Sequence, residues 1–328
     1  MKGAILRSLA AALLPLSLVI CVPSVQAQAY PSRPLRFIVP FPPGGVTDRM
    51  ARLLSQRMTE SWSQPVVVEN RPGGSGIIAC QAVTAAPPDG YTLLMGNINT
   101  HVINASLLPK LPYDPVRDFA PISLLVSVPN MLVVHPSVPA NSFQDLVALA
   151  RSRPGTLNFA SSGAGTSSHM AGELFRTMAK IDIVHVPYKG PGPALQDLLA
   201  GQVSMTFDTV SSTLPQVRAG KLKGLAVTSP GRAAVAPDIP TVAESGLPGF
   251  DVAPWFGALA RAGTPAEVIA KLNAEMVRIL GLPDIRDNLV NVQGMTVIAG
   301  TPEAFARHIE QETARWARIV RETGAKPD

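Results

Sequence analysis

The chain has 328 residues, a formal net charge of +5, 46% apolar residues and 16% charged residues. This balance excludes an intrinsically disordered chain, and the length suits one large domain or two ordinary ones. Because aromatic residues make up only 5% and no dense run of lysine and arginine occurs, nothing indicates a nucleic-acid-binding surface.

The first 29 residues predict a secretory signal peptide. Lys2 and Arg7 form a basic start, residues 9–22 are an apolar stretch, and small residues offer cleavage after Ala27 or Ala29. The stretch is too short to be read as a membrane span. We therefore expect export to the periplasm, with the mature chain beginning near residue 30.

A lipoprotein signal at residues 18–21 is the competing interpretation of this segment. It requires a small residue before Cys21, where Ile20 stands. After cleavage Cys80 is the one cysteine left in the sequence, so no internal disulfide is possible. We expect Cys80 to be a small buried apolar residue.

The mature chain opens with alternating strand and helix patterns. Strands are predicted at residues 35–40, 66–69 and 91–95. A helix follows the first strand from Val46, and another follows the glycine-rich loop at residues 71–76. This alternation is typical of a parallel α/β sheet.

Residues 122–134 form a long, β-branched stretch that is a candidate crossing segment. A helix capped by Ser142, with Asp145 as its capping-box partner, opens a second alternating run. The elements expected after it are strands at 157–161, 181–186, 203–208 and 222–228 and helices at 169–179 and 194–200.

The chain returns through a proline-rich stretch into a strand at residues 255–259. Thr264 is the expected cap of the next helix, with Pro265 at its first position. A last strand at 295–298 precedes a terminal helix that begins at Thr301.

Two alternating runs joined by two crossings predict two lobes with a cleft between them. We assign residues 30–125 and 248–328 to lobe 1 and residues 126–247 to lobe 2. Each lobe is expected to be a mostly parallel sheet flanked by helices.

Two strand–glycine loop–helix units, at residues 39–48 and 159–169, are the strongest functional signal. Free N–H groups and the dipole at a helix N-terminus favour an anion, and ligands of open α/β sheets lie at the carboxyl ends of the strands. Loops in different lobes would face each other and hold a small anion at both ends without arginine. The alternative is that both are merely tight turns.

Further pocket residues are predicted at two strand ends. Asn97 and Thr100 follow the strand at residues 91–95. Asp208 ends another strand, where it accepts a hydrogen bond from a ligand hydroxyl or amine, or else caps the helix that follows.

The alternatives of catalysis and metal binding are weaker. Ser161, Ser162, His169 and Asp208 are the residue types of a hydrolase, but no Gly-x-Ser-x-Gly motif surrounds them. The five histidines are scattered without an i,i+4 pair, and no glycine loop matches a nucleotide fingerprint. We expect no catalytic residue, metal or cofactor.

From Tyr30 almost to its end, the chain resembles the Bug (TctC-type) solute-binding proteins of tripartite tricarboxylate transporters. The order and spacing of several stretches carry the resemblance. They are YPSRPLRFIVPFPPGGVTD, QPVVVENRPG, PPDGYTLL, LPYDPVRDFAPI, SSGAGTSSHMAGELF, VHVPYKGPGPALQDLLAGQV, LAVTS, IPTVAESGLPGF and WFGALARAGTP.

The resemblance implies a two-lobed periplasmic binding protein (type II-like) that closes on a small carboxylated solute, partly through bridging water. It implies delivery to the large and small membrane subunits of a transporter, and we expect a monomer. A periplasmic sensor module for a signalling partner is the alternative. Val46 stands where the family usually has a small polar residue, which leaves the ligand open.

The residues expected at the ligand, including those the resemblance implies, share these loops and strand ends. They are Phe41, Pro43, Gly44, Gly45, Asp48, Asn97, Thr100, Ser162, Gly163, Ala164, Gly165, Thr166, Ser167, His169 and Asp208. We expect Gly45→Pro or Gly165→Pro to abolish binding while leaving the fold intact.

Overall fold

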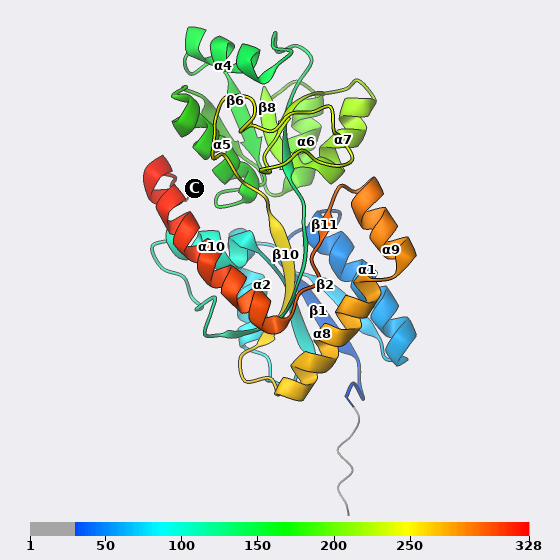
Figure 1. Ribbon diagram of the computed structural model, residues 1–328. Coiled ribbons are helices and arrows are strands. Elements are labelled where there is room, and N and C mark those ends of the chain that lie inside the picture. Colours follow the sequence, from blue (N-terminus) through cyan, green and yellow to red (C-terminus); the bar gives the residue numbers. More distant parts are fainter. Residues whose placement is uncertain (1–29, 328) are drawn as a thin grey trace, which may run out of the picture.

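The computed structural model describes residues 30–327, which form two lobes joined at a waist, where the chain crosses between them (Figure 1). The predicted signal peptide lies outside the described residues. Within them, lobe 1 contains a six-stranded sheet in the order β11-β4-β10-β3-β1-β2. The strands are β1 (Leu35–Val39), β2 (Val66–Asn70), β3 (Thr92–Asn97), β4 (Phe119–Ser127), β10 (Trp255–Arg261) and β11 (Thr296–Val297).

Helices cover both faces of the lobe 1 sheet, and successive side chains of each strand pack against helices on opposite faces. Phe37 packs in the apolar cluster with α1 (Val46–Trp62) and α8 (Ala266–Leu280). The next residue, Ile38, packs in the cluster with α2 (Ile77–Thr84) and α10 (Pro302–Thr323). Shorter elements complete the lobe: η1 (Gly74–Gly76), the π-helix η2 (Asn99–Ile103), α3 (Asn104–Leu107), α9 (Pro283–Asp287) and the π-helix η3 (Asn288–Val292).

Lobe 2 is built in the same way on a five-stranded sheet in the order β7-β6-β8-β5-β9, counted within residues 30–327. Leu132 faces the cluster with α4 (Phe143–Ser152) and α5 (Ser167–Ala179), whereas Met131 and Val133 face α6 (Pro191–Leu199) and α7 (Val210–Arg218). The strands are β5 (Asn130–Val134), β6 (Asn158–Ser161), β7 (Val184–Pro187), β8 (Met205–Thr209) and β9 (Lys223–Val227).

Both sheets are mixed, which corrects the expectation of mostly parallel sheets. Strand β1 pairs in parallel with β2 and β3, and β6 pairs in parallel with β7 and β8. Strand β10 runs antiparallel to β3 and β4, and β5 runs antiparallel to β8 and β9. The physical reason is the way the chain crosses between the lobes. Strands β5 and β10 begin at the waist and run into a lobe, whereas their neighbours β3, β4, β8 and β9 end at the waist, so they run in opposite directions.

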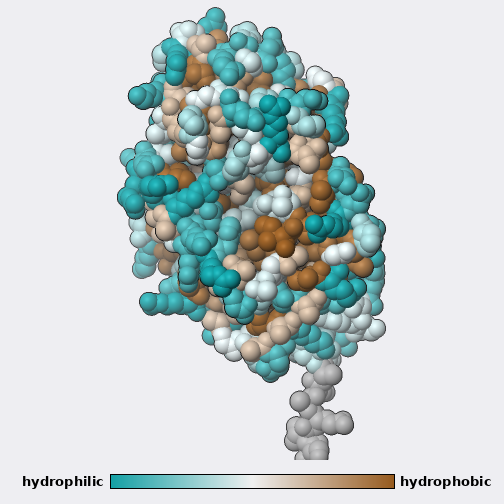
Figure 2. All heavy atoms as spheres, in the orientation of Figure 1, coloured by the Kyte–Doolittle hydropathy of each residue, from teal (hydrophilic) through white to brown (hydrophobic). Residues whose placement is uncertain are grey.

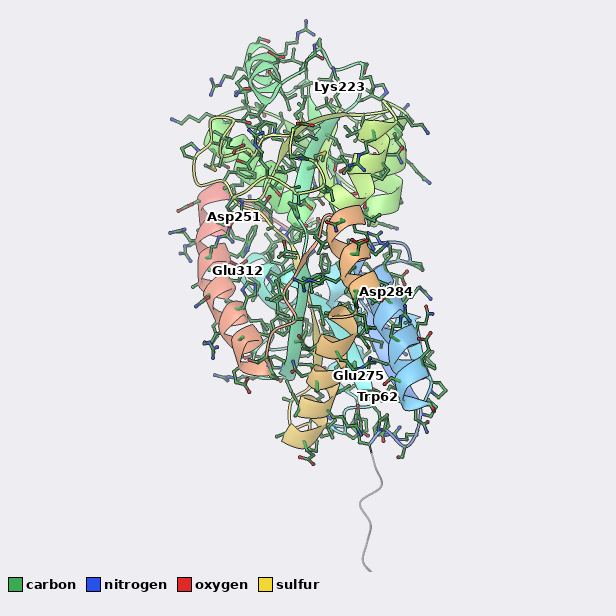
Figure 3. The ribbon with its side chains drawn as sticks, turned by 45° about the vertical axis from the view of Figure 1, so that its right-hand side comes forward. Trp62, Lys223, Asp251, Glu275, Asp284 and Glu312 are labelled. Atoms are coloured by element: carbon green, nitrogen blue, oxygen red, sulfur yellow. The ribbon has the colours of Figure 1, made fainter. Side chains whose placement is uncertain are left out.

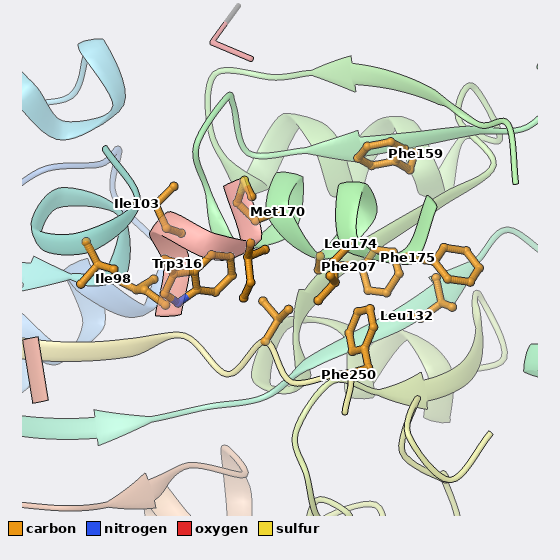
Figure 4. Close-up of a cluster of buried hydrophobic side chains, with 14 of the residues drawn as sticks. Ile98, Ile103, Leu132, Phe159, Met170, Leu174, Phe175, Phe207, Phe250 and Trp316 are labelled. Carbon is orange, nitrogen blue, oxygen red and sulfur yellow. The ribbon is translucent and has the colours of Figure 1, made fainter. Parts of the chain in front are cut away.

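The lobes are held together by more than the two crossing segments. Val128 N donates to Pro254 O at 3.0 Å, so the crossings lie side by side. Helix α10 packs on both lobes, and Figure 4 shows its Trp316 between Ile98 of lobe 1 and Met170 of lobe 2. One apolar cluster therefore runs through the waist.

An ion pair on α10 also reaches the return crossing. Arg315 Nη2 lies 3.0 Å from a carboxylate oxygen of Asp251, and Arg315 Nη1 lies 3.0 Å from Glu312 on the same helix. Figure 3 labels both acids beside the upper part of α10. This places the C-terminal helix as a brace across the waist.

The caps at Ser142 and Thr301 follow the sequence prediction, whereas α5 and α6 begin at Ser167 and Pro191, two and three residues before the predicted starts at 169 and 194. Ser142 and Asp145 form the expected capping box of α4, and Thr301 caps α10 by accepting from Ala304 N. The predicted cap of α8 is wrong, because Thr264 Oγ1 donates to Arg261 O at 2.8 Å. Its hydroxyl closes the turn after β10, and extended Pro265 then precedes the helix.

The outer surface is hydrophilic over most of the helices. Figure 2 shows a small apolar patch on this face of the waist, over β10 and β11. Ile298, which follows β11, is 41% exposed. No helix among residues 30–327 combines the length and apolar character needed to cross a membrane.

Candidate functional site: a cavity between the lobes

A cavity of about 80 Å³ lies where the carboxyl ends of strands from both lobes meet. Its lining contains no lysine or arginine, and Asp208 is its one ionisable side chain within the described residues. Lobe 1 and the return crossing contribute Phe41, Gly45, Val46, Thr47, Asn97, Asn99, Pro254 and Phe256. Lobe 2 contributes Ser162, Thr166, Ser167, Ser168, Pro191, Asp208, Thr209 and Ser212.

The N-terminus of α1 presents open backbone donors to this cavity. Gly45 is the N-cap and no side chain caps the helix. Among the described residues no partner is recorded for the N–H groups of Gly45, Val46 or Thr47, all of which line the cavity. These groups, with the helix dipole, form the anion-binding end that the sequence predicts.

Asp48 holds this loop from behind. Its carboxylate accepts hydrogen bonds from Gly44 N at 3.0 Å and from the Asn70 side chain at 2.9 Å, and it pairs with Arg52. Burial alone raises the pKa of Asp48, but these partners hold it below its ordinary value. Asp48 is 3% exposed and does not line the cavity, so the structure gives it a supporting position.

The second loop turns several backbone donors inward. Ser162 N donates to Ser168 Oγ, Gly163 N to Ser161 Oγ, and Gly165 N to His169 Nδ1. Thr166 caps α5 by accepting from His169 N. Only Ser167 N and Ser168 N are left without a recorded partner in the first turn of this helix, as far as residues 30–327 show.

His169 is therefore part of the loop's frame. It is 3% exposed, and its ring stacks on His185 with the centroids 4.2 Å apart. Burial, followed by the nearby His185 and Arg176, lowers the pKa of His169 to about 3. The neutral ring keeps Nδ1 as an acceptor for Gly165 N.

The N-terminus of α7 is a third helix end at the cavity. Thr209 N donates to Asp208 Oδ1 and Val210 N to Pro129 O. In the described part of the chain, Ser211 N and Ser212 N have no recorded acceptor. Three helix N-termini thus meet at one small space.

Asp208 and Arg49 bring charge to the rim. Burial raises the pKa of Asp208 to about 6, against the opposing effects of Thr209 N and Arg49. Arg49 Nη1 donates to Gly44 O at 2.7 Å, and its Nη2 donates across the cleft to Ser211 Oγ at 3.0 Å. Burial lowers the pKa of the Arg49 guanidinium.

A second cross-cleft hydrogen bond runs from Ser75 Oγ to Ala164 O at 2.9 Å. Both residues border a neighbouring hollow of about 760 Å³, which Lys189 also lines. With the Arg49–Ser211 bond, this contact joins the two lobes across the cleft. The molecule is therefore in a closed arrangement.

The hydrolase constellation is not assembled. Ser161 is fully buried, and its hydroxyl lies 2.6 Å from His185 Nε2 rather than beside His169. No recorded hydrogen bond joins Asp208 to a histidine within residues 30–327. In the same part of the chain, no three His, Cys, Asp or Glu side chains are placed to hold a metal ion.

Comparison with known proteins agrees with the geometry of the cavity. The family model described as "Tripartite tricarboxylate transporter family receptor" matches residues 50–325. The chain belongs to this family. The receptor is thus a Bug/TctC-type periplasmic solute-binding protein.

Relatives share most of the receptor's length. Protein BugT of Bordetella pertussis is 40% identical, covering 92% of this chain and 93% of its own. The structure titled R. palustris Rpa4515 with adipate is 38% identical with a TM-score of 0.88, covering 91% of this chain and all of its own. MatC of Rhodopseudomonas palustris with bound malate is 37% identical with a TM-score of 0.83, covering 89% of this chain and all of its own.

The cavity gathers part of the predicted pocket. Phe41, Gly45, Asn97, Ser162, Thr166, Ser167 and Asp208 line it. Gly163 and Ala164 line the larger hollow, and Pro43 and Gly44 line a third hollow beside Asp208. That any of them contacts a ligand stays a prediction.

Besides Asp48, three predicted residues sit behind the cavity wall. Thr100 is fully buried and bonds to Asn97, while Gly165 and His169 bond to each other. Cys80 is buried in an apolar cluster of the receptor as expected, and burial raises its pKa to about 12. Trp255 is buried in the same cluster.

Sequence reasoning placed a helix after Asp208 but missed Thr209 and Ser212 as cavity residues, and it missed the cross-cleft position of Arg49. Thr209 and Ser212 line the cavity, and the run Thr209–Ser212 follows a predicted strand directly. This polar run after a strand is the signal that was available. No local sequence pattern predicts the cross-cleft contact of Arg49, because its partner Ser211 is 162 residues away along the chain.

Proposed function

We propose that the receptor captures a small carboxylate in the interlobe cavity, in the periplasm, and hands it to the membrane subunits of a tripartite transporter. The observation that carries this proposal is the convergence of three helix N-termini, α1, α5 and α7, on one cavity without a cationic side chain. Such ends bind anions through N–H groups and aligned dipoles.

Two features support binding at both ends of a solute. Donors at Gly45–Thr47 come from lobe 1, whereas donors at Ser167, Ser168, Ser211 and Ser212 come from lobe 2. Closure of the lobes excludes water, which strengthens bonds between amides and carboxylates. The solved relatives titled with adipate and with malate hold dicarboxylates, which fits a clamp of this kind.

The deciding experiment is a thermal-shift screen of the mature receptor. Mono-, di- and tricarboxylates are compared with their monoamides and with neutral amides. A ligand at a hundred times its dissociation constant adds about 2.7 kcal/mol to the free energy of unfolding. A dicarboxylate hit without its monoamide supports the proposal, whereas binding of neutral amides alone overturns it.

Delivery and export belong to the same proposal. We expect cleavage after Ala27 or Ala29, and a monomer that docks on a large and a small membrane subunit. Mass spectrometry of the mature N-terminus tests cleavage, and cross-linking in membranes with and without the ligand tests docking. Capture of a sensor kinase in place of transporter subunits would favour the sensing function instead.

We infer that binding leaves the solute unchanged. The support is the buried Ser161, whose hydroxyl faces His185 inside the lobe rather than the cavity. Proton NMR of a bound carboxylate, its ethyl ester and its amide after prolonged incubation tests this. Hydrolysis that Ser162→Ala abolishes would overturn it.

A further inference from the structure

A groove of about 500 Å³ crosses the waist beside the two crossing segments and shares no lining residue with the interlobe cavity. Lobe 1 borders it with Arg286, Val290 and residues 294–297, whereas lobe 2 borders it with residues 229–234. Ala253 of the return crossing also lies in its wall. We call it the waist groove. Because its walls come from both lobes, its width changes when the lobes open or close.

The ionisable side chains of the waist groove are all basic within the described residues. They are Arg286 from lobe 1 and Arg232 from lobe 2. Arg232 is partly neutralised, because its Nε donates to a carboxylate oxygen of Glu244 at 2.9 Å. Arg286 is exposed, and in residues 30–327 its guanidinium has no recorded hydrogen bond or ion pair.

The acids nearest to Arg286 along the chain have other partners. Asp284 lies 2.9 Å from Arg57 Nη2 of α1. Asp287 accepts a hydrogen bond from the Asn291 side chain at 2.7 Å. As far as residues 30–327 show, the charge of Arg286 is therefore available to a carboxylate from outside the chain.

Exposed apolar side chains accompany this cation. Val292 is 62% exposed and Ile298 is 41% exposed, and both belong to the stretch of lobe 1 that borders the waist groove. Figure 2 shows apolar surface over β11 on this face of the waist. Apolar side chains next to an arginine are typical of protein–protein interfaces, whereas a small inorganic anion gains nothing from an apolar wall.

Strand β11 also offers an unpaired edge to the waist groove. It is the last strand of its sheet, and β4 is its one neighbour within the described residues. Ile298 N donates to Leu125 O, which continues the pairing with β4, at 2.9 Å. Because successive residues of an antiparallel strand turn their N–H and C=O groups to opposite edges, those of Val297 point away from β4. Val297 lines the groove, and an open edge of this kind pairs with an extended chain.

We propose that the waist groove is the docking surface for an extended acidic segment of the transporter's membrane subunits. A carboxylate of that segment pairs with Arg286, and its backbone pairs with Val297 at the open edge of β11. This inference rests on the proposed function, and it adds the surface and the chemistry of the partner. Since both lobes border the groove, a segment seated there binds closed and open receptor differently, which delivery of a loaded receptor requires.

The test measures binding of the receptor to its large and small membrane subunits, reconstituted together in nanodiscs of zwitterionic lipid. Biolayer interferometry gives the affinity, and empty nanodiscs are the blank. Arg286→Glu reverses the charge in the groove, whereas Arg286→Lys keeps it. Arg307→Glu is the matched control, since Arg307 is an exposed arginine of lobe 1 outside the groove. Melting curves establish that each variant folds, and Arg286→Gln is used if Arg286→Glu does not.

A second pair of variants tests the strand edge independently of charge. Val297→Pro removes the N–H that points to the open edge, and proline is accepted in an edge strand at such a position. Val297→Ala keeps the N–H and is its control. The same melting curves identify a variant that does not fold, in which case N-methylation of this backbone N–H by semisynthesis replaces Val297→Pro.

We expect Arg286→Glu to bind the subunits at least about tenfold more weakly, as for an arginine at the centre of an interface. Arg286→Lys and Arg307→Glu should stay within about threefold of the unmodified receptor, since one keeps the charge and the other lies outside the groove. Val297→Pro should bind about five- to tenfold more weakly, the value of one hydrogen bond, and Val297→Ala nearly normally.

The outcomes separate this inference from the proposed function. Equal binding of Arg286→Glu and Arg307→Glu, or equal binding to empty nanodiscs, overturns the inference and leaves the proposed function standing. Normal binding of Val297→Pro overturns the strand pairing. An unmodified receptor that does not bind the subunits overturns delivery in the proposed function, and the inference with it.

Discussion

The two glycine loops at the cavity share an order of elements but use their backbone N–H groups differently. The loop before α1 keeps the donors of Gly45, Val46 and Thr47 open, and a single acid, Asp48, holds it from behind. In the loop before α5, most backbone N–H groups donate to side chains of the same loop and helix, including His169. Similar sequence patterns thus give one loop built to donate and another built largely to hold its shape.

Acid should have the largest effect on the difference between the two loops. The loop before α5 depends on a neutral histidine, His169, whereas the loop before α1 depends on an ionised aspartate, Asp48. Protonation of His169 removes the acceptor of Gly165 N, and the pKa of His169 is lowered from 6.5 to about 3 by burial, then His185 and Arg176. Its contribution to stability is complete above pH 6.5 and is lost as the pH falls, by about 1.4 kcal/mol per pH unit. Asp48 keeps its charge in this range because its pKa is lowered.

Two other buried groups shape the acid profile. Burial lowers the pKa of His101 from 6.5 to about 3, which adds an equal loss of stability between those pH values. Asp208, raised from 3.8 to about 6, acts oppositely, since its destabilising effect disappears as the pH falls from 6 to 3.8.

Urea unfolding at pH 7, 6 and 5 tests these slopes. His169→Phe and His101→Phe should each make the free energy of unfolding fall less steeply between pH 7 and pH 5, because each removes the contribution of one histidine. Only His169→Phe should also weaken ligand binding. An unchanged slope in both variants would contradict this account.

The second prediction isolates the open donors of the first loop. Gly45 has φ −76° and ψ 175°, which proline tolerates, and a Cβ there meets nothing closer than 3.8 Å. Gly45→Pro should keep the fold and weaken carboxylate binding by about ten- to a hundredfold, the value of one hydrogen bond to a charge. Calorimetry of Gly45→Ala, which keeps the N–H, is the control and should show near-normal affinity.

The same substitution in the second loop is not equivalent, which corrects the earlier expectation for Gly165→Pro. Gly165 has φ +70°, a conformation closed to proline, and its N–H is bonded to His169. Gly165→Pro should therefore disturb the loop and the stability of lobe 2 together. A clean loss of binding at unchanged stability would show that the two loops work alike after all.

The third prediction concerns the contact that joins α1 to α7. Arg49→Met removes the donors to Gly44 O and Ser211 Oγ but keeps an apolar stem. We expect about five- to tenfold weaker binding, mainly through faster dissociation, because only the closed form loses the bond. Arg57→Met is the matched control on the same helix, since Arg57 pairs within lobe 1. Stopped-flow dissociation that is equal in both variants would remove Arg49 from the closure.

The smallest expected effect lies outside both loops. Ser142→Ala removes the capping box of α4, which should lower the free energy of unfolding by about 1 kcal/mol. Ligand affinity should stay unchanged, because α4 lies away from the cavity lining. A change in affinity of more than about twofold would mean that stability of lobe 2 alone tunes binding, and it would weaken the comparison of the loops.

The sequence by itself determined most of the strands and longer helices, the two-lobed order and the two glycine loops at strand ends. Apolar periodicity, glycine and proline positions and capping residues act within a few residues, so they are readable along the chain. The start of α10 at Thr301 and the partnership of Ser142 and Asp145 follow from such local chemistry.

Only the tertiary structure decided which donors remain open and what closes the cleft. The pairing of Gly165 N with His169, the reversal of β5 and β10, and the reach of Arg49 to Ser211 depend on backbone geometry and on how the lobes meet. Hydrogen bonds act over about 3 Å, whereas these partners in the cleft are 162 residues apart along the chain. Folding, and not sequence spacing, brings them within that distance.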